Sequence, residues 1–218
     1  MTDSLVHLAV FIEKVRAIAG TGIAFNQSGY NFHRYQELLE TAAQLEALLA
    51  GMSPQDGREL AARWQSGIAP GRDGYVTTAV GCGGIVFNQR DELLLMERTD
   101  GGWWYPAGWY DVGYLPAEVV VKEVREETGL IVEPRHLMGV FDSRLDGDVG
   151  RHYVSLLFEC ELLGGSLRPD PLEAKDAGFF AFDALPGPFH NPNPRFLEVA
   201  RRFHFEGLRE PFFDPIKT

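Results

Sequence analysis

The chain has 218 residues, which suits one domain of ordinary size or a domain with an appendage. Hydrophobic residues make up 45% of it, which excludes a disordered chain and predicts a packed core. The formal net charge of -11 argues against a DNA-binding protein, because such a protein needs a basic surface to displace counterions. A small nucleotide substrate is still allowed, since a metal ion can supply local positive charge.

A helical pattern runs through the first part of the chain. Apolar residues recur at intervals of three and four in the first turns and again over 35–49, and Ser53-Pro54 begins a further helix. We therefore predict a small helical N-terminal domain over 1–68 that mediates dimerisation or covers the substrate, with a homodimer as the expected assembly. The glycine- and proline-containing segment 67–74 is interpreted as a linker.

From residue 75 the pattern changes to that of a mixed α/β fold. Runs rich in Val, Ile and aromatic residues alternate with turn signals, and two segments have helical periodicity. The sequence predicts an α/β (α+β) sandwich with a mixed sheet over 75–206, followed by a C-terminal tail over 207–218. The expected strands are 75–88, 92–97, 131–142, 152–163 and 178–182, and the expected helices are 115–128, which ends at Gly129, and 194–205.

The predicted helix 115–128 carries three acidic residues on one stripe. Glu123, Glu126 and Glu127 are three and four residues apart, so their side chains share one helix face. Three carboxylates on one stripe repel each other unless a cation lies between them, and a hard divalent ion such as Mg²⁺ prefers oxygen ligands. Gly108 and Gly113 precede the helix in a loop that can approach a ligand closely. The pattern therefore predicts a metal site suited to phosphate chemistry.

Two further features indicate the compartment. The N-terminal segment contains Asp3 and Glu13 and does not resemble a signal peptide, and no apolar run reaches the length of a membrane span. We expect a cytoplasmic protein with no membrane partner. The two cysteines, Cys82 and Cys160, lie in apolar, strand-like runs and are expected to be buried, reduced thiols.

With the glycine, helix and acids in place, segment 106–130 (PAGWYDVGYLPAEVVVKEVREETGL) resembles the Nudix hydrolase signature. In that signature a glycine is followed at fixed spacing by Arg-Glu, an aliphatic residue, any residue, Glu-Glu, any residue and Gly. The match starts at Gly108 and places Glu123, Glu126, Glu127 and Gly129 at the family's positions. The core of the resemblance covers 75–205, and the helical N-terminal extension is similar to that of a branch that includes CDP-choline pyrophosphatases.

The resemblance implies a fold, an activity and a set of site residues. The fold is the Nudix α/β/α sandwich, and the activity is Mg²⁺-dependent (or Mn²⁺-dependent) hydrolysis of a nucleoside diphosphate linked to another moiety, such as CDP-choline or ADP-ribose. Glu123, Glu126 and Glu127 would hold the metal, the last two as catalytic residues. Glu173, in the polar loop before the last expected strand, becomes a candidate general base, with an ordinary solvated loop as the alternative.

Two positions depart from the signature. Tyr114 stands where the family has its first Glu, and Lys122 stands where it has Arg. Lys lacks the planar two-pronged donor of Arg, although Lys122 can pair with Glu126 one helical turn later. Glu118 is a candidate replacement for the missing Glu, with a plain exposed residue as the alternative. These departures motivate a second hypothesis, a catalytically weak or inactive Nudix-like nucleotide sensor.

The remaining candidates bind substrate. Arg98 and Arg144 each follow an expected strand and could grip a phosphate, with a surface arginine as the alternative for both. Trp109 follows Gly108 directly and is the aromatic residue chosen to stack on a base. His152 and His190 have no partner spacing typical of zinc and are interpreted as ordinary histidines.

Overall fold

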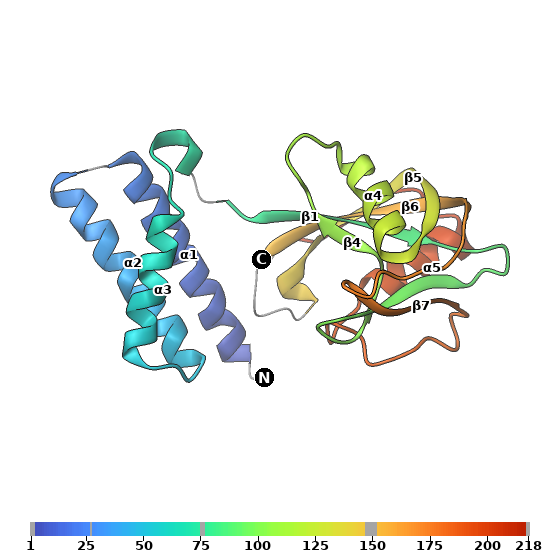
Figure 1. Cartoon of the computed structure of the whole chain (residues 1–218), viewed down its shortest axis with the longest axis horizontal. Helices are drawn as coiled ribbons and strands as arrows, with labels where there is room; N and C mark the ends of the chain where they lie inside the picture. Colours follow the sequence, from blue (N-terminus) through green and yellow to red (C-terminus); the bar gives the residue numbers. More distant parts are fainter. Residues whose placement is uncertain (1–2, 27, 75–76, 147–151, 217–218) are drawn as a thin grey trace. The chain divides into compact units, whose positions relative to one another are not determined.

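The computed structural model describes residues 3–26, 28–74, 77–146 and 152–216, and it divides into two compact units, Met1–Thr78 and Ala79–Thr218 (Figure 1). The first unit is helical, as expected. It contains α1 (Asp3–Phe25), α2 (Gly29–Leu49), α3 (Pro54–Ser66) and a short 3-10 turn, η1 (Gly71–Gly74). Among the described residues, no helix is both long enough and apolar enough to cross a membrane.

The start of α3 shows how local sequence sets a helix boundary in this unit. Ser53 caps the helix by accepting a hydrogen bond from the Asp56 N–H, while the Asp56 carboxylate accepts one from the Ser53 N–H at 2.8 Å. This reciprocal pair satisfies two N–H groups that a helix start leaves open. Part of the expected linker is packed into the unit, because a Cβ at Gly74 would lie 2.6 Å from the Ala24 Cβ. Segment 67–74 is therefore not a simple extended connection.

The second unit has two sheets, a five-stranded sheet in the order β4-β1-β6-β5-β8 and a three-stranded sheet in the order β3-β2-β7. β1 pairs in parallel with β6 and antiparallel with β4, so the larger sheet is mixed. The mixed α+β architecture predicted from the sequence is confirmed. The strands are β1 (Ala79–Val86), β2 (Leu93–Arg98), β3 (Trp103–Trp104), β4 (Ala107–Trp109), β5 (Leu130–Asp142), β6 (Tyr153–Gly165), β7 (Ala174–Phe180) and β8 (Phe212–Phe213).

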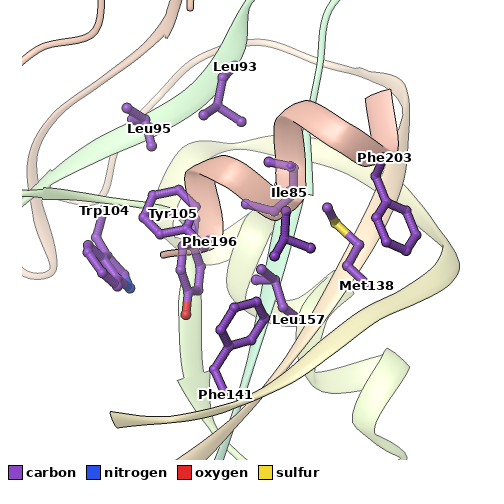
Figure 2. Close-up of a cluster of buried hydrophobic side chains, with 12 residues drawn as sticks. Ile85, Leu93, Leu95, Trp104, Tyr105, Met138, Phe141, Leu157, Phe196 and Phe203 are labelled. Atoms are coloured by element: carbon purple, nitrogen blue, oxygen red, sulfur yellow. The ribbon is translucent and has the colours of Figure 1, made fainter. Parts of the chain in front are cut away.

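Helices α4 (Pro116–Thr128) and α5 (Phe196–Glu206) pack on two different apolar clusters. Alternate residues of a strand point to opposite faces, so β1 contributes Cys82 and Val86 to the cluster under α4 and Ile85 to the cluster under α5. Figure 2 shows the second cluster, in which Phe203 of α5 lies beside Met138 of β5. Cys82 and Cys160 are both free and buried, as expected.

Three short strands lie outside the sequence prediction. β3, β4 and β8 have only two or three residues each, too few to show a two-residue periodicity. β8 lies within the predicted tail, where Phe212 pairs with Gly139 of β5. η2 (Ser143–Leu145) follows β5 as a further short turn. The first two residues of the expected strand 75–88 lie outside the described residues, and the strand begins at Ala79.

Candidate active site

The boundaries of α4 are fixed by its own sequence. Pro116 takes the first helical position, and the Glu118 carboxylate accepts a hydrogen bond from the Leu115 N–H at 2.7 Å. At the other end Gly129 has a φ of 76°, a left-handed conformation that glycine adopts without strain, and its N–H bonds to the Arg125 carbonyl. Glu118 therefore caps the helix, and its carboxylate is committed to the backbone at the helix start.

Three carboxylates gather beside the inner face of α4. Glu123, Glu127 and Glu173 can each offer one oxygen, and these oxygens lie within 4.8 Å of one another. Glu123 and Glu127 are only 8% and 5% exposed, whereas Glu173 is exposed. Glu173 comes from the turn before β7, and its carbonyl accepts a hydrogen bond from the Thr99 N–H. The fold therefore brings a late loop onto the helix acids.

Strand β4 holds both helix carboxylates in place. The Ala107 N–H donates a hydrogen bond to Glu127 Oε2 at 2.8 Å. Gly108 lies directly against the other acid, because a Cβ built there would be 2.2 Å from Glu123 Cδ. Only glycine leaves room for the carboxylate in this position. The presence of glycine at position 108 is therefore explained by packing alone, without any ligand.

The electrostatics of the cluster favour a cation. Burial raises the pKa of Glu127 to about 8, and repulsion from Glu123 and Glu173 adds to the effect. Burial also raises the pKa of Glu123. Burial and mutual repulsion make it costly for these carboxyl groups to be charged together. A hard divalent cation offsets that cost, because it neutralises the charges and prefers oxygen ligands. The donor set therefore fits Mg²⁺ or Mn²⁺.

Lys122 lies at the edge of this cluster and contacts three carboxylates. Its Nζ is 3.0 Å from Glu123 Oε1, 3.3 Å from Asp111 Oδ2 and 3.5 Å from Glu126 Oε2. Glu126 is exposed, and its carboxylate is not part of the group within 4.8 Å. The structure thus groups Glu123 and Glu127 with Glu173, while Glu126 lines the same cavity in contact with Lys122.

The acids open onto a cavity of about 750 Å³. Arg98 lines it beside the acids, and its guanidinium donates two hydrogen bonds to the Asp100 carboxylate, at 2.8 and 3.0 Å. Trp109 also lines it and packs edge-to-face on Tyr153, with ring centroids 5.4 Å apart. A cavity of this size falls within the range of small-molecule sites.

The candidate residues do not all meet in this cavity. Gly108, Trp109 and Arg98 line it, as do Lys122 and the acids of α4. Arg144 is not among the described residues that line it; its guanidinium folds back onto Asp142, two residues earlier in the chain. Arg98 is paired with a carboxylate in the same way, so the difference between the two arginines is that only Arg98 lines the cavity, and the prediction that Arg144 contacts substrate has no support from the described lining.

Sequence reasoning missed several lining residues. Asp100, Tyr153, Ser155 and His190 face this cavity but were not singled out as substrate contacts. Each of these residues lies in a different segment of the chain from the helix acids. No local sequence pattern therefore predicts that they share one cavity, and only the fold brings them together. His190 is the clearest example, since its ring bonds to the carbonyl of Gly101, which precedes it by 89 residues.

Comparisons with known proteins are consistent with this geometry. Residues 77–200 match the NUDIX domain family. The chain is 34% identical to the putative ADP-ribose pyrophosphatase YjhB of Bacillus subtilis over 80% of each protein. It is 35% identical to an ADP-ribose pyrophosphatase of Methanocaldococcus jannaschii over 51% of this chain and 67% of that protein.

The chain also resembles solved structures in three dimensions. A UDP-X diphosphatase has a TM-score of 0.58 at 25% identity and covers 96% of this chain and 99% of its own. An ADP-ribose pyrophosphatase from Streptococcus suis has a TM-score of 0.54 at 30% identity and covers 63% of this chain and 100% of its own. The first likeness extends over nearly the whole chain, whereas the second covers less than two thirds of it.

Proposed function

The chain belongs to the NUDIX family, and on that basis we propose that it is a divalent-metal-dependent pyrophosphohydrolase. Its substrate would be a nucleoside diphosphate linked to another moiety, with ADP-ribose and CDP-choline as the leading examples. One observation carries the proposal: three carboxylates from α4 and the loop before β7 converge within 4.8 Å at the wall of a ligand-sized cavity. The names of the relatives, ADP-ribose pyrophosphatase and UDP-X diphosphatase, point to the same substrate class.

The roles follow from the positions of the residues. Glu123 and Glu127 would hold Mg²⁺ or Mn²⁺, and Glu126, which lines the same cavity, would be a further ligand. When bound, the ion would neutralise the diphosphate and lower the pKa of a bound water. Glu173 would act as the general base for an attacking water, and its exposed carboxylate close to the two buried acids supports this role.

Arg98 and the Ala107 N–H would orient the substrate and the metal ligands. Arg98 presents a guanidinium to the cavity, and the Asp100 carboxylate fixes its plane. A guanidinium held in this way is suited to a phosphate oxygen. The Ala107 N–H holds Glu127 Oε2, which leaves the other carboxylate oxygen for the cation.

The test is a substrate panel with a matched pair of variants. ADP-ribose, CDP-choline and UDP-glucose are incubated with the protein with and without Mg²⁺, and phosphomonoester products are identified by mass spectrometry. We expect metal-dependent cleavage and a loss of at least 100-fold in Glu127→Gln. Glu118→Gln is the control, because Glu118 lies on the same helix and, among the described residues, its carboxylate bonds to the Leu115 N–H at the helix start and does not line the cavity. No cleavage of any member of the panel would contradict the proposal.

A binding protein without catalysis is the second candidate. The observation that favours it is the position of Lys122, whose ammonium contacts Glu123 and Glu126 and partly neutralises the cluster. Nanomolar or micromolar binding of a panel member, with no product formed in the presence of metal, would favour this reading over hydrolysis.

We also propose that the N-terminal unit mediates a homodimer. Phe11, Ile18 and Phe25 recur every seven residues along α1 and are 58%, 60% and 56% exposed. Seven-residue spacing places large apolar side chains along one stripe of a helix, which a second copy of α1 can cover. Light scattering should give a dimer for the full chain and a monomer for Ile18→Glu, and a monomeric wild type would exclude the idea.

A further inference from the structure

The cavity lining combines two kinds of side chain. The acidic residues Glu123, Glu126, Glu127 and Glu173 line it together with Lys122. Aromatic rings, among them Trp109 and Tyr153, and the ring of His190 line it as well. A diphosphate with its cation would lie against the acids, so the organic groups of the same substrate would contact other lining residues.

The ring of His190 is held in one tautomer. Its Nδ1 lies 2.9 Å from the Gly101 carbonyl oxygen. A carbonyl can only accept a hydrogen bond, so Nδ1 must carry the proton and donate it. In the neutral ring Nε2 is then a bare acceptor, and none of the described residues is bonded to it. Because His190 lines the cavity, Nε2 is the ring nitrogen that remains available to bond to a ligand.

The backbone around His190 is fixed on β3. The His190 N–H donates to the Trp103 carbonyl at 3.1 Å, and the Trp103 N–H donates to the Pro188 carbonyl at 2.9 Å. Gly102 allows this close approach, because a Cβ there would lie 2.5 Å from the His190 nitrogen. The ring therefore has both a fixed tautomer and a fixed position, the two properties that a selective contact needs.

Asp100 links His190 to Arg98. Asp100 Oδ1 lies 3.7 Å from His190 Nδ1, and the same carboxylate is gripped by the Arg98 guanidinium. The Gly101 carbonyl and this carboxylate are both acceptors on the Nδ1 side of the ring, so the tautomer of the neutral ring that fits them carries its proton on Nδ1. Arg98 supplies the donors that a phosphate needs, so a bare acceptor at His190 suits a different group.

We propose that Nε2 of His190 accepts a hydrogen bond from a sugar hydroxyl of the substrate and so selects substrates that carry this hydroxyl. The inference rests on the proposed hydrolase function for its substrate class. A phosphate oxygen offers no proton to a bare nitrogen, whereas a hydroxyl does. His190 is thus a specificity-determining residue, and Asp100 and the Gly101 carbonyl are the groups that position it.

The experiment compares His190→Ala with wild type on three related substrates. They are ADP-ribose, ADP esterified with ethanol, which lacks the second sugar, and the 2′,3′-dideoxyadenosine form of ADP-ribose. We expect kcat/KM to fall about tenfold for ADP-ribose, the size of one hydrogen bond, mainly through KM. For the analogue that lacks the contacted hydroxyl, we expect wild type and variant to agree within twofold. His190→Gln should recover part of the loss, since its amide oxygen can accept.

The controls separate this inference from the proposed function. His136→Ala serves as the matched control, because His136 is an exposed histidine of β5 that bonds to Glu159 and does not line the cavity. Dissociation constants are also measured with the three ligands in methylene-bridged form, which cannot be hydrolysed at the bridge. This readout tests His190 even if the wild type cleaves nothing. An equal loss on all three ligands, as expected for a phosphate contact, would overturn the proposal, as would no loss on any of them.

Discussion

The contact between Gly108 and Glu123 allows a quantitative prediction for Gly108→Ala. The added Cβ would lie 2.2 Å from Glu123 Cδ and 2.3 Å from its nearer oxygen. Non-bonded carbon atoms rest about 3.5 Å apart, so the carboxyl carbon must move by roughly 1.3 Å. A displacement of about 1 Å can cost roughly 100-fold in rate. We therefore expect kcat/KM for ADP-ribose with Mg²⁺ to fall about 100-fold, with a matching loss of Mn²⁺ affinity.

A double mutant tests whether the clash itself is the cause. In the Glu123→Ala background the carboxylate is gone, so adding Gly108→Ala should change kcat/KM by less than twofold. Gly67→Ala in the first unit is the control for a glycine replacement, because its added Cβ would find its nearest neighbour at 3.7 Å. The reasoning is refuted if Gly108→Ala keeps half of the wild-type activity, or if its effect is undiminished in the Glu123→Ala background.

Three further predictions concern the same helix. Burial raises the pKa of Glu127 to about 8, so below that pH a cation must displace a proton from its carboxyl group. Calorimetry should therefore show that Mg²⁺ affinity rises up to about pH 8 and levels off above it. Equal affinity at pH 6 and pH 8 would contradict this. Glu118→Ala removes the bond to the Leu115 N–H and should lower the free energy of unfolding by about 1 kcal/mol while Mg²⁺ affinity stays within twofold. A tenfold loss of affinity would instead place Glu118 at the metal. Gly129→Ala puts a side chain at a φ of 76° and a Cβ 2.6 Å from the Ser166 carbonyl, so urea denaturation should show a loss of at least about 1 kcal/mol, and an unchanged midpoint would count against the strain.

The elements with strong local signals were predictable from the sequence. The helix that ends at Gly129 has an apolar face, a proline at its first position and a glycine after its last residue, and the structure places it at Pro116–Thr128. The spacing of Glu123 and Glu127 then determines that both carboxylates leave the helix on one side. These features depend on residues a few positions apart, which is the range over which sequence patterns carry information.

The rest of the site depends on contacts between distant segments. Glu173 reaches the helix acids only because β7 pairs with β2, and no pattern in the sequence gives that register. The sequence gives His190 no partner spacing typical of zinc and so predicts an ordinary histidine, whereas its partner Gly101 lies on a distant loop that only the fold brings close. Arg98 and Arg144 each pair with a carboxylate two residues away, and only the three-dimensional arrangement shows that Arg98 lines the cavity whereas Arg144 does not.

Crystals of the protein grown with Mn²⁺ give the most direct test of the central claim, because anomalous scattering locates the ion without any assay of activity. The account predicts a Mn²⁺ peak within coordination distance of the Glu123 and Glu127 carboxylates, on the side that faces Glu173, and no such peak in Glu127→Gln. A peak bound elsewhere, or clear density with Lys122 and water alone between these carboxylates at millimolar Mn²⁺, would contradict it.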